Sequence, residues 1–245
     1  MNKIRLDEIL LLRGMAKDLK IAQSLIMQGL VHDKNQLLTK PGGILKLDHP
    51  VFIKDKKPHN FVSRGGVKLD VALKEFEIIV QDKICVDVGC STGGFTQVLL
   101  QNGAQKVFAV DVAYGEFDYN LRQNDRVILY EKTNVRFITP KEIYLKPNLI
   151  VCDVSFISIK LALSSLVEFV EVNTEFLVLI KPQFESSKGA TEKGIVKDKN
   201  IWVEVCDDIM NWFQKEHNYF IRGIIPSSIL GGKGNKEFFI YAIKQ

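Results

Sequence analysis

A turn of small and polar residues lies near the middle of the chain, at positions 87–94 (Asp-Val-Gly-Cys-Ser-Thr-Gly-Gly). The apolar run 84–86 before it is typical of a buried parallel strand, and residues 95–100 after it are typical of the first turns of a helix. Small residues let backbone N–H groups approach a ligand closely, and the start of a helix adds a favourable dipole. The segment therefore predicts a ligand-binding turn between a strand and a helix.

The spacing of this turn differs from two common nucleotide-binding motifs. Cys90 and Ser91 follow the first glycine, unlike the dinucleotide pattern G-x-G-x-x-G, and no Gly-Lys-Ser/Thr triplet ends the turn as in a P-loop. Asp87 opens the turn and suits a cationic cofactor better than a pyrophosphate. Asp111 follows the next apolar run, where α/β sheets place a carboxylate for ribose hydroxyls. These features suit S-adenosylmethionine, with its amino and sulfonium groups; a glycine turn in another kind of α/β enzyme is the alternative.

Two further polar residues directly follow apolar runs. Asp153 closes the run 149–152, and Lys181 closes the run 176–180 just before Pro182. Ligands of open α/β sheets bind beyond the carboxyl ends of the strands, so both side chains are expected in one crevice. A solvated strand end explains either residue alone, but a lysine between a buried strand and a proline is harder to explain in that way.

Strand and helix patterns alternate from residue 61 onward. Helices are expected near 65–76 and 202–213, and two apolar runs at 220–225 and 237–243 indicate a terminal antiparallel hairpin. The remaining strands are expected at 84–88, 107–111, 127–130, 149–152 and 176–180. This alternation predicts an α/β fold with a Rossmann-like, mostly parallel sheet and helices on both faces.

The first 60 residues follow a different pattern. Apolar residues at helical spacing predict a helix that ends at Arg13-Gly14 and a second helix that Asp18 caps and Gly29 ends. Short strands are expected near 30–31, 36–37 and 44–47, and residues 54–60 form a polar linker. The chain is thus divided into a small α+β domain with its linker, residues 1–60, and a larger domain, residues 61–245.

Composition narrows the class of protein. The chain has 245 residues and 46% hydrophobic content, which is enough to bury a sizeable core. Its four cysteines lack C-x-x-C spacing and are expected as free thiols in a reducing cytoplasm, while its four histidines lack ligand spacing, so no metal site is expected. No run of about 18 uncharged apolar residues occurs, so stable membrane insertion is not expected.

The positive charge is concentrated in the first domain. Residues 1–60 carry 11 Lys and Arg against 6 Asp and Glu, whereas residues 61–245 carry 22 against 23. A basic module on a near-neutral body suggests a domain that docks on a polyanion. A solvated surface with surplus lysines is the alternative.

Five segments, spread in order over the chain, resemble the TlyA (hemolysin A) family: 63–69, 87–96, 153–158, 181–185 and 234–238. The resemblance implies an S4-like RNA-binding domain joined to an FtsJ-like methyltransferase domain that uses S-adenosylmethionine. It further implies that the enzyme methylates the 2′-hydroxyl of a cytidine in 16S or 23S ribosomal RNA, or both, and acts on ribosomal subunits.

By the same resemblance, a catalytic tetrad falls on Lys68, Asp153, Lys181 and Glu237. A ribose hydroxyl is a weak acid and needs a base or a polarising environment to attack a sulfonium methyl group. We expect Lys181 to be that base and the two carboxylates to orient the two ammonium groups. A solvated lysine at position 68 and an edge charge at position 237 are the alternatives.

The resemblance also implies binding residues. Cofactor contacts are expected from Asp87, Gly89, Ser91, Thr92, Gly93, Gly94, Phe95, Asp111 and Asn134. RNA contacts are expected, from the charge of the residues and not from the resemblance, at Arg5, Lys17, Lys20, Lys34, Lys40 and Arg64. The small domain departs from the S4 pattern, because Asp18-Leu19 stands where Ser-Arg usually opens the second helix.

Two other classes of function remain as alternatives. A membrane-active cytolysin is suggested by the older family name, although the sequence has no spanning segment. A non-catalytic RNA-binding factor for ribosome assembly would need no tetrad, so the tetrad and the glycine turn favour an enzyme. A small-molecule methyltransferase would not need the basic first domain.

Overall fold

The computed structural model describes residues 3–27, 29–34, 36–53, 60–187 and 189–245, and the chain divides into two compact units, residues 1–60 and 61–245. Most of the linker predicted at 54–60 lies outside the described residues. None of the helices described is long and apolar enough to cross a membrane.

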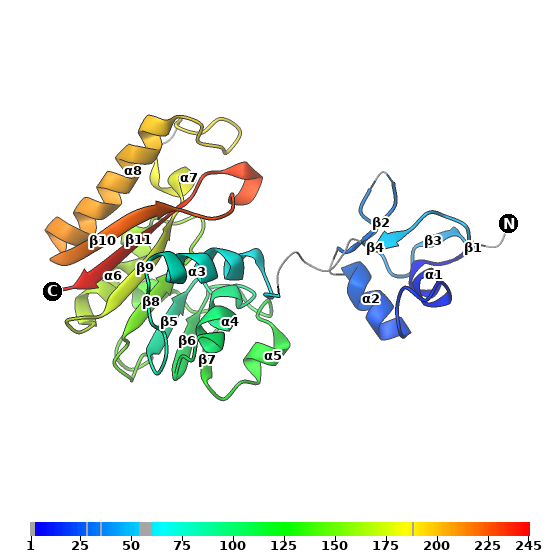
Figure 1. The fold of residues 1–245 in the computed structure, drawn as a ribbon, viewed down its shortest axis with the longest axis horizontal. Helices are drawn as coiled ribbons and strands as arrows, with labels where there is room; N and C mark the ends of the chain where they lie inside the picture. The colour runs from blue at the N-terminus through cyan, green and yellow to red at the C-terminus, as the bar shows by residue number, and fades with distance from the viewer. Residues whose placement is uncertain (1–2, 28, 35, 54–59, 188) are drawn as a thin grey trace. The chain divides into compact units, whose positions relative to one another are not determined.

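The first unit packs two helices against two small antiparallel sheets (Figure 1). The core consists of Leu6, Ile9, Leu10, Ala16, Ala22, Ile26, Val31 and Val51. Asp18 caps the second helix as predicted, because its carboxylate accepts a hydrogen bond from the backbone N–H of Ile21 at 2.8 Å. The helices are α1 (Leu6–Leu12) and α2 (Leu19–Met27), and the strand pairs are β1 (Lys3–Arg5) with β3 (Ile44–Lys46) and β2 (Val31–His32) with β4 (Phe52–Ile53).

The prediction of a strand at residues 36–37 is wrong. Only Leu37 pairs, in a single bridge with His32. The cause is a tight turn, in which the Asp33 carboxylate accepts the backbone N–H of Gln36 at 2.8 Å and the Asp33 N–H donates to the Gln36 carbonyl at 3.0 Å.

The second unit contains a seven-stranded sheet in the order β10-β11-β9-β8-β5-β6-β7 (Figure 1). The five strands from β5 to β9 are parallel, and β11 runs antiparallel between β9 and β10. The predicted α/β sheet with a terminal antiparallel hairpin is therefore confirmed. The strands are β5 (Ile84–Val88), β6 (Lys106–Val110), β7 (Val127–Tyr130), β8 (Leu149–Cys152), β9 (Glu175–Ile180), β10 (Tyr219–Pro226) and β11 (Phe238–Lys244).

Helices cover both faces of this sheet. Apolar side chains of α3 and α4 pack with alternate strand residues such as Cys85 and Val107 in one cluster, and those of α6 and α8 pack with Val86 and Phe108 in another. The helices are α3 (Arg64–Glu75), α4 (Gly94–Gln101), α5 (Tyr119–Arg122), α6 (Ile159–Phe169), α7 (Pro182–Glu185) and α8 (Lys199–Asn211), with shorter or irregular turns at η1 (Val135–Phe137), η2 (Trp212–Glu216) and η3 (Gly232–Gly234).

Candidate active site

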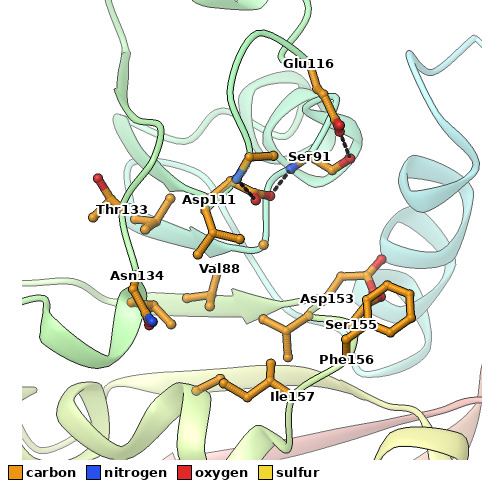
Figure 2. Close-up of a pocket in the computed structure, with 17 residues that line it drawn as sticks. Val88, Ser91, Asp111, Glu116, Thr133, Asn134, Asp153, Ser155, Phe156 and Ile157 are labelled. Atoms are coloured by element: carbon orange, nitrogen blue, oxygen red, sulfur yellow. Dashed lines mark hydrogen bonds between the residues drawn. The ribbon is translucent and has the colours of Figure 1, made fainter.

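The carboxyl ends of β5, β6 and β8 surround a hollow of about 440 Å³, which we call the strand-end pocket (Figure 2). It lies where the chain order reverses, since β6 is on one side of β5 and β8 is on the other. Such a switch point is the usual ligand site of an open α/β sheet. The lining residues are Val88, Gly89, Ser91, Val110, Asp111, Val112, Ala113, Glu116, Thr133, Asn134, Val135, Asp153, Val154, Ser155, Phe156, Ile157 and Ala162.

The backbone conformation at position 89, beside this pocket, requires a glycine. Its φ is +81°, and a Cβ atom there would lie 2.8 Å from the carbonyl oxygen of Asp153. Both the left-handed conformation and the close approach of the ends of β5 and β8 therefore exclude a side chain. The glycine keeps this wall of the pocket open to a ligand.

Asp111 is held rigidly at the end of β6. One carboxylate oxygen accepts the backbone N–H of Ser91 at 2.7 Å, and the other accepts that of Ala113 at 2.8 Å (Figure 2). Asn134 lines the same pocket, while its side chain also accepts the N–H of Arg136 and so caps η1. These two predicted cofactor residues thus share a pocket with Gly89 and Ser91.

The remaining turn residues lie where α3 and α4 begin. A Cβ atom on Gly94 would lie 2.1 Å from the Ser63 hydroxyl, so this glycine allows the two helix starts to touch. A smaller hollow of about 300 Å³, the middle pocket, opens beside them. Its lining residues are Ser63, Gly65, Gly89, Cys90, Ser91, Thr92, Gly94, Phe95, Asp153, Ser155 and Lys181. Gly93, with φ +92°, faces Leu121 and Phe117 and is not among the lining residues.

Asp87 is fully buried and lines none of these pockets. It follows Val86 in the strand and points toward α4, where the Thr96 hydroxyl donates to its carboxylate at 2.6 Å. Burial raises the pKa of Asp87 to about 7, against the opposing effect of the Thr96 hydrogen bond. The structure therefore places Asp87 beneath the turn, where it supports the backbone.

Replacing Asp87 with asparagine is expected to remove a pH dependence of stability. The folded pKa of about 7 lies above the ordinary value of 3.8, so the folded protein keeps a proton that the unfolded chain releases. For the wild type, the free energy of unfolding should therefore fall as pH rises from about 4 to 7. The total fall across this window is on the order of 4 kcal/mol if Asp87 alone is responsible. Urea unfolding of both proteins across this window measures the effect. A wild-type-minus-variant difference that does not change with pH would contradict it.

The predicted tetrad forms two ion pairs. Lys68 on α3 donates to Glu237 at 2.6 Å, and both residues are buried, with 8% and 2% of their surfaces exposed. Lys181, at the end of β9, pairs with Asp153, at the end of β8, at 2.5 Å. The antiparallel register of β11 explains the arrangement, because it pairs Phe238 with Ile180 and so places Glu237 at the strand end that carries Lys181.

A third hollow of about 420 Å³, the lysine pocket, joins the two pairs. Lys68, Lys181 and Glu237 line it, and Lys181 also lines the middle pocket together with Asp153. All four tetrad residues thus line two hollows that share Ser155 and Lys181. The full lining consists of Lys68, Ser155, Phe156, Lys181, Gln183, Phe184, Thr191, Gly194, Gly232, Lys233, Asn235 and Glu237.

Several lining residues were not predicted, among them Ser155, Phe156 and Gln183. Gln183 donates to Glu237 at 3.4 Å. Phe156 is 91% exposed and has φ +64°, a strained conformation for an aromatic residue. Their nearness to the predicted residues Asp153 and Lys181 is the signal in the sequence that marks them.

The predicted RNA contacts differ in their surroundings. Lys17, Lys20 and Lys40 are exposed on the first unit. Arg5 forms hydrogen bonds with the buried carboxylate of Asp7 at 2.6 and 2.9 Å, and this pairing lowers the pKa of Asp7 to about 2. Arg64 belongs to the second unit, at the start of α3, and donates to the carbonyl of Leu230.

Known proteins resemble the chain over nearly its whole length. Residues 61–244 match the family described as FtsJ-like methyltransferase. The chain is 35% identical to the 16S/23S rRNA (cytidine-2′-O)-methyltransferase TlyA of Mycobacterium tuberculosis, covering 98% of this chain and 90% of the relative. It is 39% identical to Hemolysin A of Brachyspira hyodysenteriae, with 98% and 100% covered. A solved structure from Streptococcus thermophilus is 36% identical, with a TM-score of 0.75 and 100% and 90% covered.

Proposed function

Because this chain belongs to the FtsJ-like methyltransferase family, we propose that it methylates the 2′-hydroxyl of a cytidine in ribosomal RNA, with S-adenosylmethionine as the methyl donor. The substrate class follows that of the TlyA relative, whose name specifies a cytidine-2′-O position in 16S and 23S rRNA. The observation that carries the proposal is the pairing of Lys68 with Glu237 and of Lys181 with Asp153 at two pockets that share lining residues with the strand-end pocket.

The strand-end and middle pockets fit the cofactor. Asp111 presents a fixed carboxylate where the ribose hydroxyls would bind, with Asn134 beside it. Gly89, Ser91, Thr92, Gly94 and Phe95 provide a backbone cradle for the methionine part. When bound, S-adenosylmethionine supplies an activated methyl group whose carbon–sulfur bond breaks with the electron pair leaving on sulfur.

Lys181 is the proposed base. In its neutral form its Nζ accepts the proton of the ribose 2′-hydroxyl as the oxygen attacks, and Asp153 orients it from 2.5 Å. Lys68 and Glu237 also line the lysine pocket, where they would fix the position of the ribose.

The first unit is the proposed RNA-docking domain, with the second unit as the catalytic domain. Its surplus of basic residues and its exposed Lys17, Lys20 and Lys40 support contact with phosphates. The partner is ribosomal RNA in a ribosomal subunit, and the enzyme would therefore work in the cytoplasm.

The test is a methylation assay on ribosomal particles that lack the modification. The full-length protein is incubated with methyl-labelled S-adenosylmethionine and separate 30S, 50S and 70S particles, and the labelled nucleotide is mapped by nuclease digestion and mass spectrometry. Label on the ribose of a cytidine is expected. Label on a base would contradict the assigned chemistry. RNA binding that needs no cofactor, with no label transferred to the RNA, would favour the alternative of a non-catalytic assembly factor.

Changing Lys17, Lys20 and Lys40 together to glutamine is expected to weaken RNA binding by roughly 10- to 100-fold and to reduce the salt dependence of binding. Each lost phosphate contact reduces the magnitude of the slope of log K against log salt concentration by about 1. The magnitude of the slope for the triple variant should therefore be smaller by up to about 3. Fluorescence anisotropy with an rRNA fragment measures both quantities. A matched triple change of Lys83, Lys106 and Lys146, near the amino ends of β5, β6 and β8, is the control. Equal losses in both variants would contradict a specific role of the first unit.

A further inference from the structure

Ser155 lies where the three pockets meet. It lines the strand-end pocket, the middle pocket and the lysine pocket, and among the residues described it alone lines all three. Its hydroxyl is therefore adjacent both to the proposed cofactor site and to the proposed site of the ribose.

The Ser155 hydroxyl holds the proposed base. Lys181 Nζ donates to Ser155 Oγ at 2.8 Å, in addition to its ion pair with Asp153 at 2.5 Å. Asp153 and Ser155 both belong to the loop that follows β8, and the ring centre of Phe184 lies 5.9 Å from Nζ. Asp153 Oδ1 has no hydrogen-bond partner among the described residues, so it attracts the amine by its charge, whereas Ser155 is the directional acceptor of the amine.

The hydrogen bond to Ser155 and the charge of Asp153 together limit the direction of the lone pair on the nitrogen. An ammonium group has three N–H bonds, whereas a neutral amine has two N–H bonds and one lone pair in a tetrahedral arrangement. When one N–H bond points to Ser155, rotation about the Cε–Nζ bond stops and the lone pair has two possible directions. The negative charge of Asp153, at 2.5 Å, disfavours the direction that points toward it. Without the Ser155 hydroxyl, no directional hydrogen bond stops this rotation.

The loop that carries Ser155 is fixed at both ends. At its start, the backbone N–H of Asp153 donates to the Val88 carbonyl at 2.9 Å. At its end, the Glu185 carboxylate accepts from the Ser158 hydroxyl at 2.7 Å and from the N–H of Ile159 at 2.8 Å, where α6 begins. The left-handed backbone of Phe156 turns the chain between these anchors. Ser155 is therefore presented by a constrained turn.

We propose that Ser155 is a positioning residue for methyl transfer, which fixes the Lys181 amine so that its lone pair faces the ribose hydroxyl in the lysine pocket. This inference rests on the proposed function. In the step itself, the hydroxyl proton would move to the neutral Nζ of Lys181, which becomes an ammonium group, while the oxygen bonds to the methyl carbon and the carbon–sulfur bond of the methyl donor breaks, leaving its electron pair on sulfur. Ser155 neither gains nor loses a proton.

The test compares Ser155→Ala with Ser155→Thr in the full-length protein. The alanine variant is expected to lower kcat by about 10- to 100-fold, less than the roughly 10²- to 10⁴-fold contribution of a general base, because the base remains but is less well aligned. KM for the RNA particle, affinity for S-adenosylhomocysteine by calorimetry and Tm should change little. Threonine keeps the hydroxyl and should restore kcat to within about fivefold of the wild type.

Ser164→Ala is the matched control, since it removes an exposed serine hydroxyl on α6 that donates to the Leu161 carbonyl at 3.0 Å and lines none of the three pockets. It should leave kcat within about twofold of the wild type and change Tm little. An undiminished kcat in Ser155→Ala, or an equal loss in Ser155→Thr, overturns the inference alone. No ribose methylation by the wild type would overturn the proposed function and this inference with it.

Discussion

Lys181→Met is expected to lower kcat for ribose methylation by roughly 10²- to 10⁴-fold, the contribution typical of a general base. Methionine keeps most of the side-chain volume but cannot accept the hydroxyl proton. Cofactor binding should be largely retained, because Asp111 and the glycine turn are unchanged. Single-turnover methylation at saturating RNA, together with calorimetry of S-adenosylhomocysteine, measures the two effects separately.

Lys83→Met is the matched control for this change. Lys83 also forms an ion pair with a carboxylate, Glu175, at 2.6 Å, but it lies at the amino edge of the sheet, just before β5. Its replacement should leave kcat unaffected. Methylation by Lys181→Met at more than a tenth of the wild-type rate would show that another group is the base.

Replacing one partner of the buried Lys68–Glu237 ion pair, by Glu237→Gln or Lys68→Met, is expected to destabilise the protein by about 3–5 kcal/mol. The reason is that the remaining charge stays buried without its partner, and the pair has only 9% and 2% of its side-chain surfaces exposed. For a domain of this size, that loss corresponds to a Tm lower by roughly 6–20 °C. Activity should also fall, because the wall of the lysine pocket is disturbed.

The double variant Lys68→Met/Glu237→Leu separates stability from catalysis. Replacing both charges with apolar side chains should restore much of the stability, since no charge is left unpaired, while methylation stays lost. Lys146→Met, which breaks the exposed Lys146–Glu171 pair, is the control and should cost at most about 1 kcal/mol. Additive losses in the double variant would contradict a direct coupling between Lys68 and Glu237.

The parallel part of the sheet could be predicted because buried strands have continuous apolar sequences. The apolar runs at 84–86, 149–152 and 176–180 each lie in a strand, and Asp153 and Lys181, which follow the last two, lie at one edge of the sheet. The predicted resemblance to the TlyA family is confirmed by the identity with a TlyA protein over both units. In the first unit, by contrast, strands of two or three residues are too short for a periodic signal.

The arrangement of the site could be predicted only in part. Asp87 and Asp153 look alike in the sequence, since each is an acid at the end of an apolar run. Asp87 is still within β5 and points toward α4, whereas Asp153 has left β8 and faces the pockets. Whether the strand ends before or after the aspartate therefore decides whether its side chain faces the pockets. The division of the tetrad into two ion pairs depends on where β11 joins the sheet, which no local pattern specifies.

The position of β11 has a consequence for how the enzyme matures during translation. This strand is made after all the others of the sheet, yet it lies between β9 and β10 and brings Glu237 to Lys68. A nascent chain that has emerged only as far as β10 cannot hold β10 in its final place, because β11 is the one described strand with which β10 pairs. The growing polypeptide should therefore remain inactive until its final strand inserts, so methylation competence would appear late and abruptly during synthesis.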